Sequence, residues 1–167
     1  MQLQDRSALL VAERKIEDIG VDKSLLIVDD DEPFLRRLAK AMEKRGFEVE
    51  TAASVAAGRA ISTARPPAYA VVDLRLEDGN GLDVVKELNK NKSDSRIVML
   101  TGYGNLPTAV AAVKVGAIDY IAKPVDADDV EAALLASPES KAKPPENPMS
   151  ADRVKWEHIH RVFELCN

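Results

Sequence analysis

The feature of the sequence that most constrains the fold is a set of short apolar runs that recur at roughly even intervals. Each run is rich in Val, Ile, Leu or Ala and too short for a helix, which is typical of strands. The segments between the runs have helical spacing, and strands that alternate with helices indicate a parallel sheet covered on both faces. The predicted strands are "SLLIV" (24–28), "FEVETA" (47–52), "AYAVV" (68–72), "RIVML" (96–100) and "IDYIA" (118–122).

The intervening segments carry the signals that start and stop helices. In the first of them, Pro33 suits a first turn and Gly46 suits the C-terminal stop. Asp31 is the expected N-cap of this helix, and Ser54 is the expected N-cap of the next. The pattern therefore predicts an α/β protein with a doubly wound, five-stranded parallel sheet. The other helical segments are "GLDVVKELNKN" (81–91), "NLPTAVAAVKVG" (105–116) and "DADDVEAALLA" (126–136).

Composition narrows the class of protein. The formal charge of −5 argues against nucleic-acid binding by this chain alone. A single cysteine, Cys166, allows no intramolecular disulfide and favours a reducing compartment, and its role stays open. No stretch reaches the ~20 apolar residues of a membrane span, and the N-terminus lacks the basic-then-apolar order of a signal peptide. We therefore expect a cytoplasmic protein without membrane contact.

Both ends of the chain depart from the alternation of strands and helices. Residues 1–22 carry weak helical signals and are interpreted as an N-terminal arm. Residues 138–149 concentrate prolines, which predicts an extended linker. Residues 150–167 predict an amphipathic helix whose apolar face needs a partner, because a lone helix of this length is marginal in water. We expect a second module to begin at this helix.

Polar side chains follow four of the predicted strands at the point where each strand ends. In an open parallel sheet these ends meet at one edge, where ligands bind. Carboxylates ~4 Å apart repel by about 4 kcal/mol per pair at an effective dielectric of 20, so either some are protonated or a cation is bound. Carboxylate oxygens suit Mg²⁺ that retains several waters. The residues at this edge are Asp29 and Asp30, Asp73, Thr101, and Lys123 with Pro124.

Most of these residues also have an ordinary structural explanation when taken alone. Asp73 could start a turn before "EDGNG" (77–81), and Thr101 and Lys123 could be surface residues. Asp31 is best explained as a helix cap, but one cap does not account for its two neighbours. The convergence is the informative feature, since carboxylates, a cation, a hydroxyl and an ammonium together suit a phosphoryl group.

The order Asp-Asp, Asp, Thr and Lys-Pro at the strand ends resembles the receiver domain of two-component response regulators. The resemblance covers residues 23–137 and implies a flavodoxin-like (βα)5 fold. It implies that Asp73 is the phospho-acceptor. It also implies that Mg²⁺ is held directly by Asp30, Asp73 and the main-chain carbonyl of Arg75, while Asp29 acts through water.

The resemblance also implies a switch and its partners. Thr101 and Lys123 would contact the phosphoryl oxygens, and Tyr120 would turn inward when Thr101 moves. The Lys123–Pro124 peptide bond would be cis. A sensor histidine kinase would be the phosphodonor, and phosphorylation would favour a homodimer through the fourth helix, fifth strand and fifth helix, around residues 105–135. Such a domain assists its own phosphorylation without being a conventional enzyme.

Longer stretches are similar to the RegA/PrrA/ActR group of redox-responsive regulators. These stretches are "VDDDEPFLRRLAKAMEKRGF", "VVDLRLEDGNGL" and "LTGYGNLPTAVAAVKVGAIDYIAKP". That group carries a Fis-type helix-turn-helix after a proline-rich linker, and "WEHIHRVFELCN" resembles its first helix. The recognition helix is missing from this sequence, so we expect specific DNA binding, and with it transcriptional control, only in a full-length protein.

Two alternatives stay open at this point. A phosphatase with an aspartyl-phosphate intermediate uses a similar sheet, but such enzymes place an Asp-x-Asp motif after the first strand and add a cap domain. A stand-alone relay domain would pass the phosphoryl group to another protein, which the proline-rich linker and the following helix disfavour.

Overall fold

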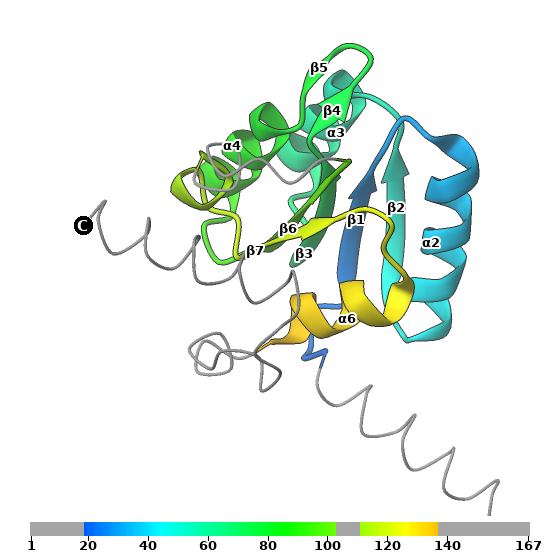
Figure 1. Cartoon of the computed structure of the whole chain (residues 1–167). Helices are drawn as coiled ribbons and strands as arrows, with labels where there is room; N and C mark the ends of the chain where they lie inside the picture. The colour runs from blue at the N-terminus through cyan, green and yellow to red at the C-terminus, as the bar shows by residue number, and fades with distance from the viewer. Residues whose placement is uncertain (1–18, 103–110, 137–167) are drawn as a thin grey trace, which may run out of the picture.

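A five-stranded parallel sheet forms the centre of the computed structural model, which describes residues 19–102 and 111–136. Its strand order is β2-β1-β3-β6-β7, so the chain winds outward from β1 in both directions (Figure 1), as predicted for a doubly wound sheet. The strands are β1 (Ser24–Val28), β2 (Glu48–Ala52), β3 (Tyr69–Asp73), β6 (Arg96–Thr101) and β7 (Asp119–Ala122). A separate antiparallel hairpin consists of β4 (Arg75–Leu76) and β5 (Gly79–Asn80).

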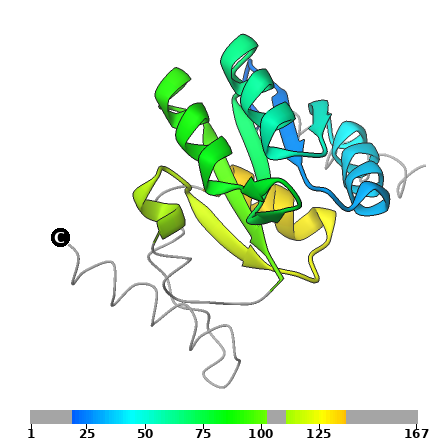
Figure 2. The same cartoon turned by 90° about the horizontal axis from the view of Figure 1, so that it is seen from above.

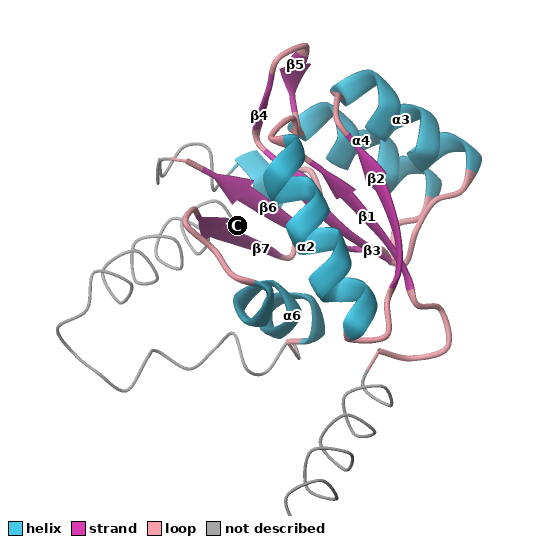
Figure 3. Cartoon of the chain, turned by 90° about the vertical axis from the view of Figure 1, so that its right-hand side faces the viewer, coloured by secondary structure: helices cyan, strands magenta, loops and turns pink. Residues whose placement is uncertain are grey.

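Helices cover the two faces of the sheet in pairs. On one face, α2 (Glu32–Lys44) contacts α6 (Ala127–Leu135), and Figure 3 shows both in front of the strands. On the other face, α3 (Val55–Ala64) contacts α4 (Leu82–Asn91), and the two lie side by side in Figure 2. Each pair encloses its own half of the apolar core against the sheet.

The helices begin where the sequence predicts. Asp31 caps α2, and its side chain accepts a hydrogen bond from Phe34 N at 3.1 Å. Ser54 caps α3 in the same way through Ala57 N at 3.1 Å. Each cap satisfies an amide that has no partner within its own helix, which fixes the residue at which the helix starts.

Burial differs between the central strands and β2. All five residues of β3 are buried, and in β1 only Ser24 is partly exposed. The edge strand β2 differs, because Glu48 and Thr51 are exposed and Val49 and Glu50 are half-buried. Charged residues on an edge strand oppose pairing with another chain. β7, the strand at the other edge, is half-buried along its whole length, so only the three central strands are covered on both faces.

The folded domain begins before residue 23, which differs from the arm assigned to residues 1–22. Ile19 is 1% exposed and packs in the core beneath α2 and α6. The Tyr69 hydroxyl donates a hydrogen bond to the Ile19 carbonyl, and Lys92 Nζ lies 3.1 Å from Asp22 Oδ2. An apolar side chain and one ion pair thus hold residues 19–22 against the sheet.

Several expectations fall on residues outside the described part. These are most of the N-terminal arm, the first part of the helix predicted over 105–116, the linker 138–149 and the helix 150–167 with Cys166. Within the described residues, no helix is long and apolar enough to cross a membrane.

Candidate functional site

The C-terminal ends of β1, β3 and β7 bring three carboxylates and one ammonium group together. One oxygen each from Asp29, Asp30 and Asp73 lie within 4.8 Å of one another. Asp29 and Asp73 are 0% and 7% exposed, whereas Asp30 is half-buried. Lys123 Nζ lies 2.7 Å from Asp29 Oδ2 and 3.7 Å from Asp73 Oδ1. Thr101, the last residue of β6, is buried at the same edge of the sheet.

The acids in the loop after β1 have two different roles: Asp31 caps α2, whereas Asp29 and Asp30 belong to the site. Asp29 Oδ1 accepts a hydrogen bond from Asp31 N at 2.9 Å, and Asp31 in turn caps α2. Asp30 Oδ2 accepts a hydrogen bond from Glu77 N at 3.0 Å, which ties this loop to the β4–β5 hairpin. The backbone amides of Asp31 and Glu77 thus hold the Asp29 and Asp30 carboxylates in place, whereas the Asp31 carboxylate caps α2.

Asp78 anchors the same hairpin on its other side. Its carboxylate accepts hydrogen bonds from Val55 N at 2.8 Å and Ala56 N at 3.1 Å, at the start of α3. These two bonds hold the pKa of Asp78 below its ordinary value. The hairpin that carries Arg75 is therefore attached both to α3 and to Asp30. Sequence reasoning predicted a turn here but missed these contacts, because they join segments more than twenty positions apart.

Gly81 is required by the close approach of the chain after β3. A Cβ atom at this position would lie 2.0 Å from the Asp73 carbonyl oxygen. The Gly81 amide donates a hydrogen bond to the Leu74 carbonyl at 2.8 Å, and α4 starts at the next residue. A residue without a side chain is needed for α4 to begin directly against the end of β3.

The electrostatics of the site are unfavourable to three ionised carboxyls. Burial, together with the charges of Asp29 and Asp30, raises the pKa of Asp73 to about 6, and Lys123 opposes this rise. Burial alone lowers the pKa of Lys123, but its hydrogen bond to Asp29 and the nearby carboxylates outweigh that effect and raise it. One ammonium therefore only partly offsets the repulsion among the acids.

This donor set fits a small, hard cation. Asp30 and Asp73 contribute carboxylate oxygens within reach of one another, and oxygen is the ligand that Mg²⁺ prefers. Both oxygens of Asp29 already accept hydrogen bonds, from Asp31 N and Lys123 Nζ, which suits a contact through water better than a direct bond. The raised pKa of Asp73 shows that its ionised form is destabilised by burial and by its acidic neighbours. A bound cation would stabilise that ionised form.

The remaining expected residues lie near this edge of the sheet. The Lys123–Pro124 peptide bond is cis, as expected. Lys123 N donates a hydrogen bond to the Thr101 carbonyl at 2.7 Å, so β6 and β7 stay paired to their ends. Tyr120 pairs with Met99 in the sheet and is half-buried against the core on the α3 and α4 face.

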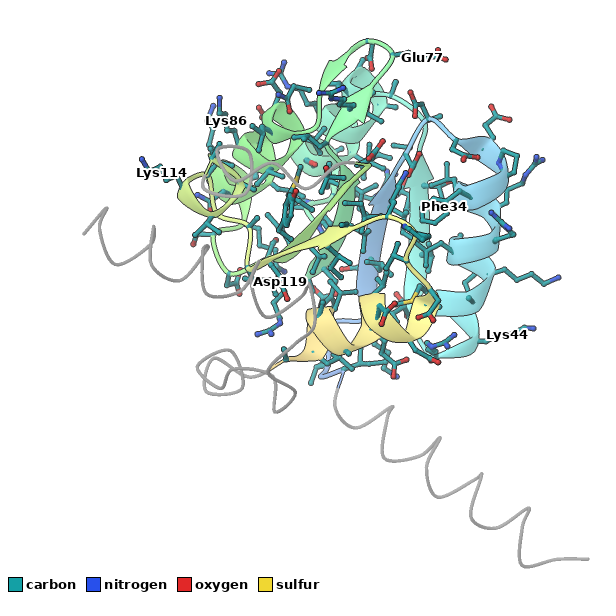
Figure 4. The ribbon with its side chains drawn as sticks, viewed as in Figure 1. Phe34, Lys44, Glu77, Lys86, Lys114 and Asp119 are labelled. Atoms are coloured by element: carbon teal, nitrogen blue, oxygen red, sulfur yellow. The ribbon has the colours of Figure 1, made fainter. Side chains whose placement is uncertain are left out.

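Phe34, near the start of α2, is a neighbour of the site that the sequence analysis did not identify. Lys123 Nζ lies 4.7 Å from the centroid of its ring. Figure 4 shows Phe34 at the end of α2 nearest the strand tips, Lys44 at the far end and Glu77 on the hairpin. The spacing that marks a helix face does not reveal a contact with Lys123, which lies nearly ninety positions later.

Comparisons with known proteins agree with this fold. Residues 25–135 match the family model of the response regulator receiver domain. The chain is 68% identical over 157 residues to the photosynthetic apparatus regulatory protein RegA of Cereibacter sphaeroides, covering 94% of this chain and 85% of RegA. It is 64% identical over 148 residues to the acid tolerance regulatory protein ActR of Rhizobium meliloti, covering 89% of this chain and 76% of ActR.

Solved structures of response regulators have the same fold. A response regulator from Burkholderia pseudomallei, crystallised with a phosphorylated aspartic acid, a calcium ion and citrate, superimposes with a TM-score of 0.69 at 34% identity. That match covers 87% of this chain and 86% of the other. A CheY-like receiver domain protein from Methanospirillum hungatei gives a TM-score of 0.63 at 34% identity, covering 66% and 88%. The chain therefore belongs to the response regulator receiver domain family of two-component systems, alongside the RegA and ActR regulators.

Proposed function

We propose that this chain is a phosphorylation-controlled switch in which Asp73 accepts a phosphoryl group from a sensor histidine kinase. The observation that carries the proposal is the convergence of Asp29, Asp30, Asp73 and Lys123 at one edge of the sheet. The phosphorylated aspartic acid of the similar Burkholderia regulator supports it.

Asp73 is well suited to be the nucleophile. With a pKa of about 6, its carboxyl is largely ionised at neutral pH but more basic than an ordinary aspartate. One of its oxygens attacks phosphorus and forms an acyl phosphate. The bond from phosphorus to the histidine nitrogen of the donor breaks, and that nitrogen keeps the electron pair.

The surrounding residues neutralise and orient the transferred group. Lys123 Nζ, 3.7 Å from Asp73 Oδ1, is placed to bind a phosphoryl oxygen, and Thr101 offers a hydroxyl from the neighbouring strand. Asp30, Asp73 and the Arg75 carbonyl would hold Mg²⁺, with Asp29 acting through water. Bound Mg²⁺ would supply positive charge that stabilises the phosphoryl oxygens.

The consequence of phosphorylation would be a change on the face formed by β7, α6 and the helix that precedes β7. Thr101 would move toward the phosphoryl group and Tyr120, now half-buried, would fill the space it leaves. We propose that this face then forms a homodimer. In a full-length regulator in the cytoplasm the dimer would control DNA binding, and the domain would act as a switch rather than a conventional enzyme.

The direct test is incubation of the chain with Mg²⁺ and acetyl phosphate, followed by intact mass measurement. We expect a mass gain of one phosphoryl group that requires Mg²⁺ and is absent in Asp73→Asn. Asp83→Asn is the matched control, because the Asp83 side chain is 54% exposed on α4 and its one ion pair with another described residue is a long contact of 3.9 Å with Lys86 Nζ. An unmodified wild-type chain, or equal gain in Asp73→Asn, would overturn the proposal.

The same reaction separates the switch from a phosphatase. A phosphatase turns over a generic phosphate ester continuously, whereas a switch gains at most one phosphoryl group per chain. Measurement of the molar mass in solution before and after acetyl phosphate tests the proposed dimer, and a mass that does not change would contradict it.

A further inference from the structure

The only described cation within ion-pair distance of Asp73 is Lys123, and its side chain is held from two directions. On one side it donates a hydrogen bond to Asp29 Oδ2 at 2.7 Å. On the other side its ammonium lies over the ring of Phe34, 4.7 Å from the centroid. Both distances are within the range in which such contacts attract.

The two contacts act differently on the ammonium group. Asp29 takes one of the three N–H donors, whereas a ring face attracts the positive charge without competing strongly for the donors. The contact with Phe34 therefore leaves N–H groups available for an oxygen of the transferred group. The Lys123 side chain is 25% exposed, so its long stem would otherwise have space to swing into solvent.

Phe34 is itself fixed by the loop that supplies the carboxylates. Its amide donates a hydrogen bond to Asp31 Oδ1, the N-cap of α2, and Asp31 N donates to Asp29 Oδ1. The ring also packs against the core on the α2 and α6 face. The position of the ring is thus set relative to Asp29 by two hydrogen bonds, one of which is the N-cap contact of α2.

We propose that Phe34 is a positioning residue for phosphoryl transfer: its ring holds the Lys123 ammonium within reach of Asp73 while leaving its donors available. The inference rests on the proposed function of Asp73. It goes beyond a packing role, because it requires an aromatic face and not merely an apolar side chain at position 34.

Conservative variants test this requirement. We expect Phe34→Leu, which keeps an apolar side chain, to slow phosphorylation by acetyl phosphate about fivefold, and Phe34→Tyr to stay within about twofold of wild type. Thermal unfolding of each variant shows that the fold is retained. Equal rates for Phe34→Leu and wild type would overturn the inference.

A double-mutant cycle shows whether Phe34 acts through Lys123. In a Lys123→Gln background, which already reacts more slowly, we expect Phe34→Leu to change the rate by less than about twofold. The same fold loss in both backgrounds would mean that Phe34 acts in another way, and the inference would fail.

A readout that needs no phosphoryl group separates this inference from the proposed function. In the free protein, the ε-methylene protons of Lys123 should show an upfield ring-current shift in NMR spectra that Phe34→Leu removes and Phe34→Tyr retains. Absence of that shift would overturn the contact itself. If the shift is present but the wild-type chain is never phosphorylated, the proposed function fails and the positioning role fails with it.

Discussion

The two ends of the sheet hold their charged groups in opposite ways. At the C-terminal end, Asp29, Asp30 and Asp73 crowd around one lysine, and the pKa of Asp73 is raised to about 6. At the N-terminal end, Asp22 accepts hydrogen bonds from Ser24 N at 3.1 Å and Ser24 Oγ at 2.6 Å and pairs with Lys92, so its pKa is lowered.

The N-terminal end is where the described chain is fastened. The Tyr69 hydroxyl donates to the Ile19 carbonyl, and the Arg96 guanidinium donates to the carbonyls of Leu134 and Ala136 at the end of α6. Tyr69 and Arg96 are paired neighbours in β3 and β6. The first and last described segments are therefore both attached to the same end of the sheet, opposite the acidic site.

The difference teaches which charges serve stability and which serve binding. Paired charges with satisfied hydrogen bonds lower the free energy of the folded state. Like charges kept together raise it, and they are retained where a ligand compensates them. Four substitutions probe the two ends of the sheet, and two of them remove one of the contrasted charges.

The largest expected effect comes from Gly81→Ala beside the acidic site. The new Cβ would lie 2.0 Å from the Asp73 carbonyl oxygen, a rigid backbone atom, so the start of α4 must shift. We expect the free energy of unfolding to fall by at least about 3 kcal/mol, measured by urea denaturation. Gly102→Ala is the control, because a Cβ there meets no atom of the described residues within 4 Å. Equal losses in both variants would refute this explanation.

Asp73→Asn should stabilise the metal-free protein. The shift from 3.8 to about 6 means that the folded state holds a proton more tightly than the unfolded state, so stability falls as pH rises through this window. Removing the charge should therefore raise the free energy of unfolding by about 3 kcal/mol at pH 7 and by little at pH 4. A variant that is less stable than wild type at pH 7 would contradict the raised pKa.

Tyr69→Phe tests the fastening at the opposite end. It keeps the edge-to-face contact with Phe47, whose ring centroid is 5.3 Å away, but removes the hydroxyl that satisfies the Ile19 carbonyl. We expect the free energy of unfolding to fall by about 1 kcal/mol and amide hydrogen exchange in residues 19–22 to become faster. Unchanged exchange there would show that Ile19 is held by its apolar side chain alone.

The smallest effect is expected for Asp22→Asn, and its sign is opposite to that of Asp73→Asn. The pKa of Asp22 is lowered by its bonds to Ser24 and Lys92, so its contribution is present above the unfolded pKa and lost in acid. The Asp22 side chain is about half exposed in its pair with Lys92, so solvent screens the interaction. The free energy of unfolding at pH 7 should therefore fall by only about 0.5 kcal/mol. A gain in stability would remove the contrast between the two ends.

Much of the fold was predictable because its signals are local. Apolar runs marked the strands, and Asp31 and Ser54 marked the helix starts, since a cap acts within three residues. The clustering of Asp29, Asp73 and Lys123 was also predictable, because parallel strands end at a common edge. The start of the domain was not, because nothing local shows that Ile19 reaches Tyr69.

Contacts between distant segments account for the rest. The Arg45 guanidinium at the end of α2 pairs with two acids on α6, with Nη2 2.6 Å from Asp128 Oδ1 and Nε 2.9 Å from Glu131 Oε2. No spacing rule in the sequence joins these positions. The bonds of Asp78 to α3 and of Glu77 to Asp30 are of the same kind. All of these contacts depend on how the helices and the hairpin pack against the sheet and against one another.

The sequence by itself determined the order of strands and helices, the edge at which Asp29, Asp30, Asp73, Thr101 and Lys123 gather, and the kind of chemistry they suit. These follow from periodicity, capping and the parallel direction of the strands, which act over short distances. The tertiary structure alone decided which oxygen faces Lys123, that Phe34 lies under its ammonium, and that Gly81 touches the Asp73 carbonyl. Such contacts are set by packing between segments far apart in the chain, where a shift of one ångström changes the partner.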